Sequence, residues 1–114
     1  MTCRVTFWGT RGSIPTPGPA TIRYGGNTPC VTVEGAGPLV ILDAGSGLRC
    51  LGHELMRSPE RRFRAELLLS HTHWDHIQGL PFFKPLSLPG NALTVYGAAQ
   101  AGVPLEEMLG RQMD

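Results

Sequence analysis

Short apolar stretches alternate with glycine- and proline-rich loops along the chain, and their spacing predicts the secondary structure. Strands are expected where apolar and polar residues alternate, or where aliphatic and β-branched residues form short runs. Residues 65–70 (AELLLS) form a nearly continuous apolar run, which is typical of a strand buried on both faces. The other predicted strands are residues 3–8, 30–34, 39–42 and 92–96. The turn sequence GAGP between the strands at 30–34 and 39–42 predicts a hairpin.

Helical spacing of leucine and methionine predicts two helices. Residues 48–57 carry apolar residues on one helical face, and Pro59 is expected to end that helix. A second helix is expected after Pro104, with an apolar stripe at Leu105, Met108 and Leu109. Between the helices, a short helical turn is expected to begin near Asp75 and to fail at the sequence GLP, residues 79–81.

Composition limits the class of protein only broadly. A length of 114 residues suits one small domain, and no apolar run is long enough to cross a membrane. The formal net charge of +1 gives no support to a nucleic-acid footprint, although a local basic patch can exist within a neutral total. Cys3, Cys30 and Cys50 are widely spaced, so reduced and partly buried thiols in a cytoplasmic protein are expected.

The most informative segment is HTHWDH, which follows the apolar run at 65–70 directly. It holds three of the four histidines of the chain, His71, His73 and His76, together with Asp75. Imidazole nitrogen and carboxylate oxygen are the ligands that suit zinc, and they also bind iron or manganese. The end of a buried strand is where open α/β sheets usually hold their sites. By contrast, His53 stands alone within the first predicted helix and is expected to be solvated or locally hydrogen-bonded.

The chain resembles the first half of the metallo-β-lactamase superfamily. HTHWDH matches its His-x-His-x-Asp-His signature, and FWGTRGSIPTPG, YGGNTPCV, ILDAGSGLRCLG and LLLSHTHWDHIQGLPFF follow one another in the expected order. The similarity is greater to phosphodiesterase and tRNA 3′-processing members than to antibiotic-degrading ones. The resemblance implies an α/β fold in which residues 1–114 form one partial domain. That domain would be the N-terminal half of a four-layer αββα sandwich, a mixed sheet with flanking helices.

The resemblance also implies roles for individual residues. His71 and His73 would bind a first divalent metal ion, and Asp75 and His76 a second, with zinc expected and manganese or iron as alternatives. Two such ions about 3.5–4 Å apart activate a shared water molecule, and Asp75 would be catalytic as a ligand that accepts a proton. Asp43 would support the ligands from the second shell, although a turn residue that caps the following helix is an equal and compatible interpretation. The implied substrate is a small-molecule or nucleotide phosphodiester, or another ester.

Residues near the motif have simpler interpretations. The loop at 9–29 lacks the Lys-Ser/Thr ending of a P-loop, so its glycines are interpreted as turn-forming, while Arg11 or Arg23 could reach a substrate phosphate. Trp74 is expected to pack rather than to stack on a base. The arginine-rich stretch at 57–64 is interpreted as a solvated face.

The chain lacks residues that the resemblance requires for a complete site. No histidine follows His76, and the only later aspartate is Asp114. Two histidines leave zinc underligated, because catalytic sites usually provide three protein ligands and one open position. A truncated product is the favoured explanation, with a second chain or an inactive remnant as alternatives. Half a sandwich would also leave one sheet face uncovered and one edge unpaired.

Two main hypotheses of function follow. The first is a metal-dependent hydrolase whose dinuclear centre needs a C-terminal half or another chain for completion. The alternative is a catalytically inactive half-domain that acts as a metal-binding or assembly module. A third and weaker hypothesis is an iron-dependent oxidoreductase or sulfur dioxygenase. Metal content measured together with phosphodiester hydrolysis would separate the first two.

Overall fold

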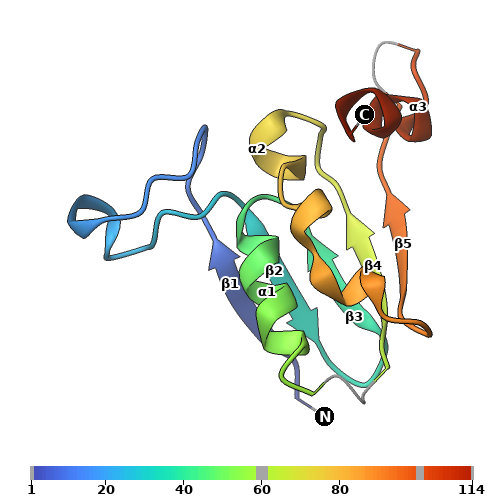
Figure 1. Cartoon of the computed structure of the whole chain (residues 1–114), viewed down its shortest axis with the longest axis horizontal. Coiled ribbons are helices and arrows are strands. Elements are labelled where there is room, and N and C mark those ends of the chain that lie inside the picture. The colour runs from blue at the N-terminus through green and yellow to red at the C-terminus, as the bar shows by residue number, and fades with distance from the viewer. Residues whose placement is uncertain (1, 59–61, 100–101, 114) are drawn as a thin grey trace.

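A five-stranded mixed sheet organises the fold (Figure 1). The structure, a computed structural model, describes residues 2–58, 62–99 and 102–113. The strands lie in the order of the chain, and their bounds are β1 Arg4–Gly9, β2 Cys30–Glu34, β3 Leu39–Leu42, β4 Arg64–Leu68 and β5 Ala92–Tyr96. β1, β2 and β3 pair antiparallel, which confirms the predicted hairpin, whereas β3, β4 and β5 pair parallel.

Helical segments cover one face of this sheet. α1 (Gly47–Leu55) and the 3₁₀ segments η2 (Leu80–Phe82) and η3 (Lys84–Ser87) lie across the face that Figure 1 shows in front. The remaining segments are η1 (Pro19–Thr21), α2 (Trp74–Ile77) and α3 (Leu105–Met113). Among the described residues, no helix has the length and apolar character that crossing a bilayer requires.

The end of α1 differs from the prediction, which extended the helix to residue 57. The amide of Arg57 bonds to the carbonyl of Glu54, and that of Ser58 to Leu55. These bonds span three residues instead of four, so the last turn tightens and α1 ends at Leu55. Pro59, the predicted stop, lies outside the described residues.

The hydrophobic core lies between the sheet and its helical cover. Ile41 and Leu67 from the central strands are fully buried against Leu48 and Leu51 of α1, and Phe83 closes the core beside η3. β3, β4 and β5 each contribute every second residue to this core, as the period of two requires.

The opposite face of the sheet is open in the described part of the chain. Val5, Phe7, Leu42, Leu68 and Tyr96 are between 38% and 69% exposed there. The expectation that β4 is buried on both faces is therefore wrong, because no described element covers its second face. Within the described residues this face is uncovered, as the half-sandwich interpretation expects.

The cysteines are free thiols, as predicted, but Cys3 is exposed and only Cys30 is buried. Burial, with smaller effects from Asp43 and Cys50, raises the pKa of the Cys30 thiol to about 12. Since the thiolate is the nucleophile, Cys30 is expected to resist iodoacetamide in the folded chain at every pH below this value, while Cys3 reacts readily. Mass spectrometry of timed reactions would test this, with urea-unfolded protein as the control. Alkylation of native Cys30 as fast as Cys3 would contradict the prediction.

Candidate metal centre

The parallel pairing of β3 and β4 determines where the polar residues meet. The carboxyl ends of these neighbouring strands lie at the same edge of the sheet, and Leu42 is in register with Leu68. Asp43 follows β3 and Ser70 follows β4, so the topology brings them together. The Asp43 amide donates to the Leu68 carbonyl at 3.0 Å. Asp43 has a φ of 64°, a left-handed conformation that aspartate adopts more readily than most residues.

The loop after β3 also holds α2 in place. The Ala44 amide donates to the His76 carbonyl at 2.8 Å, and the Gly79 amide donates to the Ala44 carbonyl at 2.9 Å. The backbones approach so closely that a Cβ at Gly79 would lie 2.1 Å from the Gly45 carbonyl oxygen. The two segments therefore fix His76 relative to Asp43 through backbone contacts.

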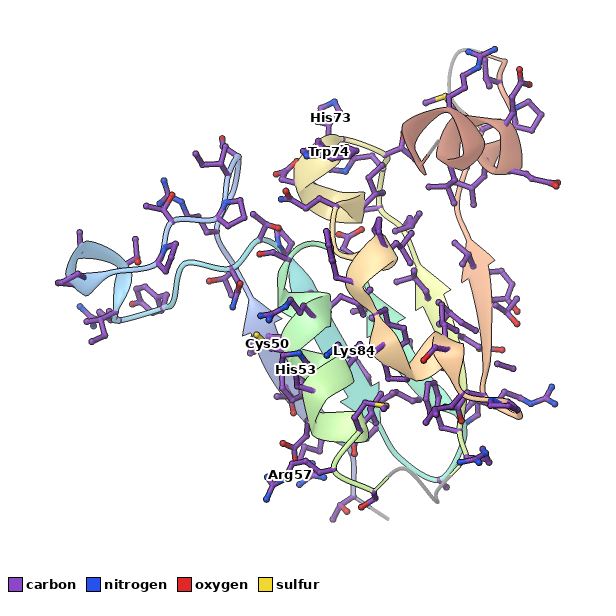
Figure 2. The ribbon with its side chains drawn as sticks, in the orientation of Figure 1. Cys50, His53, Arg57, His73, Trp74 and Lys84 are labelled. Atoms are coloured by element: carbon purple, nitrogen blue, oxygen red, sulfur yellow. The ribbon has the colours of Figure 1, made fainter. Side chains whose placement is uncertain are left out.

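All four predicted ligand residues lie in this small region. The ring centroid of His71 is 4.5 Å from that of His73 and 4.1 Å from that of His76. The Nε2 atom of His76 is 3.5 Å from an Asp75 carboxylate oxygen. His73 is exposed at the outer end of the site, beside Trp74 (Figure 2), whereas His71, Asp75 and His76 are partly buried.

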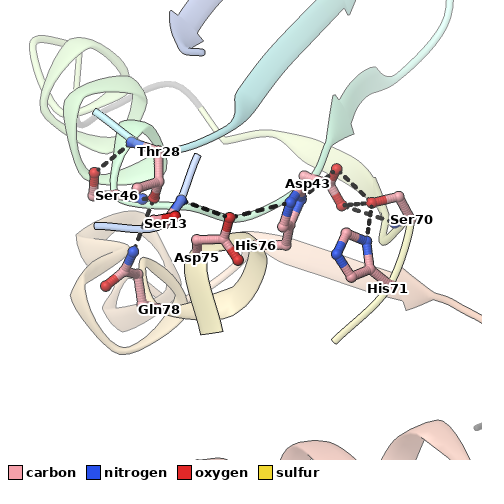
Figure 3. A network of polar contacts seen from close by, with 9 residues as sticks. All are labelled: Ser13, Thr28, Asp43, Ser46, Ser70, His71, Asp75, His76 and Gln78. Carbon is pink, nitrogen blue, oxygen red and sulfur yellow. Dashed lines mark hydrogen bonds and ion pairs between the residues drawn. The ribbon is translucent and has the colours of Figure 1, made fainter. Parts of the chain in front are cut away.

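The Asp43 carboxylate contacts the His76 imidazole and Ser70 directly (Figure 3). The Nδ1 atom of His76 is 3.0 Å from Asp43 Oδ2. The Ser70 amide donates to Asp43 Oδ1 at 2.7 Å, and the Ser70 hydroxyl contacts both carboxylate oxygens. No side-chain hydrogen bond caps the start of α1, and the Asp43 carboxylate contacts Ser70 and His76 instead of the helix. Sequence reasoning missed Ser70, whose only signal was its position directly before the motif.

The long loop between β1 and β2 holds the site from the other side. The Ser13 amide donates to Asp75 Oδ2 at 3.2 Å. Partial burial raises the pKa of Asp75, but this hydrogen bond and the neighbouring His76 and His71 outweigh burial, and the net pKa lies below its usual range. Further along the loop, the Thr28 hydroxyl accepts a hydrogen bond from Gln78 Nε2 at 3.0 Å. These two contacts support the interpretation that the loop at residues 9–29 has a structural role.

The donor set suits divalent transition metals, although it is incomplete. Three imidazoles and a carboxylate are the ligand types of zinc sites. Asp43 contacts the Nδ1 atom of His76, which leaves Nε2 for an ion, as in carboxylate–histidine–metal arrangements. Across the described residues, however, no three His, Cys, Asp or Glu side chains converge closely enough to hold an ion as they stand. By residue type, though not by their present spacing, these side chains fit such an ion.

Four other residues considered in the sequence analysis differ in exposure and contacts. Trp74 is 54% exposed, so the expectation that it packs is wrong for the described part of the chain, because no element covers it. His53 is exposed, as predicted. The guanidinium of Arg11 donates to the Ile14 carbonyl, and that of Arg23 lies 5.3 Å from the centroid of the Tyr24 ring. Both arginines line a cavity of about 430 Å³ formed by the long loop.

Comparisons with known proteins agree with this architecture. The chain is 34% identical over 97 residues to ribonuclease Z of Bradyrhizobium diazoefficiens, which covers 82% of the chain and 29% of that protein. It is 36% identical over 81 residues to ribonuclease Z of Haloarcula marismortui, which covers 71% of the chain and 23% of that protein. No model of a protein family matches the chain.

A solved structure supports the same fold. Human tRNase Z, short form, superposes with a TM-score of 0.58 and 24% identity over 98% of this chain and 39% of that one. This likeness shows the fold that the sequence predicted, and the ribonuclease Z matches support the predicted resemblance to the metallo-β-lactamase superfamily. Within the superfamily, its similarity lies on the tRNA 3′-processing branch. The chain spans less than a third of the length of these two ribonuclease Z relatives.

Proposed function

We propose that the chain carries the N-terminal part of a metal-dependent hydrolase that cleaves a phosphodiester bond in RNA. The observation that carries this proposal is the cluster of His71, His73, Asp75 and His76 at the end of β4, with Asp43 behind it. The ribonuclease Z relatives favour RNA over the small-molecule esters that the sequence alone left open. The nearly neutral charge does not itself indicate RNA, so phosphate contacts would be local, with Arg11 and Arg23 as candidates.

The residues of the cluster would have distinct roles in metal binding and positioning. His71 and His73 would hold one divalent ion, and Asp75 and His76 a second, with zinc as the first candidate. When bound, such ions would supply Lewis-acid chemistry, which would lower the pKa of a water molecule and polarise the phosphoryl oxygen. Asp43 orients the His76 ring through Nδ1, and the Ser13 amide holds the Asp75 carboxylate. Asp75 is also the candidate proton acceptor of the site.

The remaining ligands would come from outside residues 1–114. The exposed apolar face of the sheet and the incomplete ligand set support this proposal. A continuation of the same product, or a second chain, would supply further histidine and aspartate ligands and cover that face. An inactive metal-binding half-domain is the second candidate, and the lack of convergence among three described ligand side chains is the observation that favours it.

Zinc binding and hydrolysis measured together would test these proposals. In calorimetry, His71→Ala is expected to weaken zinc binding by well over tenfold, since even residues that only support a ligand contribute about 10–100-fold. His53→Ala is the matched control, because His53 is exposed on α1, outside the cluster, and should leave zinc affinity unchanged. Absence of zinc binding by the wild-type chain in excess zinc would refute the metal site. Zinc binding without turnover of bis-nitrophenyl phosphate would favour the half-domain.

A further inference from the structure

The Ser70 hydroxyl lies between the Asp43 carboxylate and the His71 ring (Figure 3). Its oxygen is 2.8 Å from Asp43 Oδ2, 3.0 Å from Oδ1 and 2.9 Å from His71 Nδ1. The backbone amide of Ser70 also donates to Asp43, which fixes the position of the residue. The Ser70 hydroxyl thus links the Asp43 carboxylate to the His71 imidazole. No direct contact between Asp43 and His71 is shown.

Proton counting sets the direction of these hydrogen bonds. An ionised carboxylate only accepts, so Asp43 takes the single proton of the Ser70 hydroxyl. The Ser70 oxygen then has lone pairs to accept a hydrogen from His71, which places that hydrogen on Nδ1. By the same reasoning, His76 donates its Nδ1 hydrogen directly to Asp43 Oδ2. His71 is then left with a free lone pair on Nε2, whereas the Nε2 atom of His76 lies 3.5 Å from an Asp75 carboxylate oxygen.

We propose that Ser70 is a positioning residue that extends the influence of Asp43 from His76 to His71. Through this relay, one carboxylate fixes the tautomer of two imidazoles, the first directly and the second through a hydroxyl. The proposal rests on the proposed metal site for its purpose, since a free Nε2 lone pair is what a metal ion requires. The relay itself is a property of the chain without metal.

The exposure of Ser70 limits the size of its effect. Asp43 and His76 side chains are only 15% and 17% exposed, so their contact is well shielded from water. Ser70 is exposed, and water can replace part of what its hydroxyl provides. Loss of the hydroxyl is therefore expected to weaken zinc binding by about tenfold, the lower end of the range for residues that support a ligand.

Three variants separate the relay from a general loss of structure. Ser70→Ala removes the hydroxyl but keeps the backbone bond to Asp43, and Ser70→Thr restores a hydroxyl at the same position. Ser87→Ala is the matched control, because the Ser87 hydroxyl donates only to the Lys84 carbonyl among the bonds shown, in η3 rather than at the site. Circular dichroism would establish that each variant is folded.

The test is nitrogen NMR of the histidine rings in the metal-free chain at mildly alkaline pH, where free imidazoles are neutral. His71 is expected to be the Nδ1–H tautomer in the wild type, Ser70→Thr and Ser87→Ala, and a mixture of tautomers in Ser70→Ala. Comparison with His71→Gln assigns the signal. An Nε2–H tautomer in the wild type, or a tautomer unchanged in Ser70→Ala, would overturn the proposal.

Zinc titration of the same proteins distinguishes the two proposals. Weaker binding in Ser70→Ala, with recovery in Ser70→Thr, supports the relay and the metal site together. If the wild type binds no zinc while the tautomers follow the expected pattern, the metal site fails and the relay stands. Equal zinc affinity in Ser70→Ala and the wild type, with the tautomer unmoved, rejects the relay and leaves the metal site intact.

Discussion

Gly79→Ala is expected to destabilise the chain by about 3 kcal/mol, the upper end for overpacking in a dense interior. A Cβ at this position would lie 2.1 Å from the Gly45 carbonyl oxygen, 2.9 Å from its carbon and 3.0 Å from the Ala44 carbonyl oxygen. All three atoms belong to the backbone, so no side-chain rotation can relieve the contact. The φ of Gly79 is −80°, which alanine tolerates, so the cost comes from the clash rather than from backbone strain.

Urea denaturation of Gly79→Ala and Gly37→Ala would measure this effect. A Cβ at Gly37 would have no atom within 4 Å, and Gly37 has no positive φ, so its replacement should be neutral or slightly stabilising. The comparison isolates the close approach, because both variants remove the same backbone freedom from the unfolded chain. Equal stability of the two variants would show that the loop after β3 and α2 can separate without cost.

The clash also predicts a functional consequence. Gly79 donates its amide to the Ala44 carbonyl, and the Ala44 amide donates to the His76 carbonyl. Moving α2 away from this loop would shift His76 relative to Asp43, whose contact depends on a distance of 3.0 Å. Gly79→Ala should therefore weaken zinc binding as well as stability, even though Gly79 carries no side chain.

Local sequence patterns predicted much of this fold, because short segments carry their own preferences for strand, helix or turn. β2, β3 and β5 have the predicted bounds, since each is a short run bounded by glycine, proline, asparagine or aspartate. The exposure of Leu68 was not predictable in this way, because burial of its face depends on what packs against the sheet rather than on the strand itself. The strand order, which decides that β3 and β4 are parallel neighbours, is likewise a long-range property.

The candidate site likewise has one part that local sequence predicts and another that depends on long-range contacts. HTHWDH predicted the candidate ligands because potential metal-binding residues concentrated in six positions are visible in the sequence. The contacts of Asp43 could not be predicted from local sequence, because only the parallel pairing places it beside Ser70 and His76. The Ser13 contact to Asp75 joins residues 62 positions apart through a backbone amide, a group that every residue except proline carries. Sequence offers no signal for such a contact.

Asp43→Ala is expected to weaken zinc binding by about 100-fold, the upper end for a residue that supports metal ligands. The variant removes the acceptor for three donors at once: the Ser70 amide, the Ser70 hydroxyl and the Nδ1 of His76. Alanine is also disfavoured at a φ of 64°, so part of any change would come from backbone strain. Asp43→Asn tolerates this conformation and keeps one carbonyl acceptor, so its zinc affinity should lie between those of the wild type and Asp43→Ala.

Calorimetry on folded protein would measure these affinities, with Glu34→Gln as the matched carboxylate control. Glu34 makes an exposed ion pair with Arg4, and such pairs contribute little. Wild-type affinity in a folded Asp43→Ala chain would contradict the prediction.

A double-mutant cycle of Ser70→Ala and Asp43→Ala tests whether these two residues act through one relay. If Ser70 acts on His71 through Asp43, the Ser70 hydroxyl loses its influence once the carboxylate is gone. The double variant should then bind zinc no more weakly than Asp43→Ala alone, although Ser70→Ala weakens binding in the wild-type background. Independent contributions would instead multiply, to a loss of about 1000-fold from the single effects of about tenfold and 100-fold expected for supporting residues. The cycle therefore distinguishes one connected relay from two separate supports of the same site.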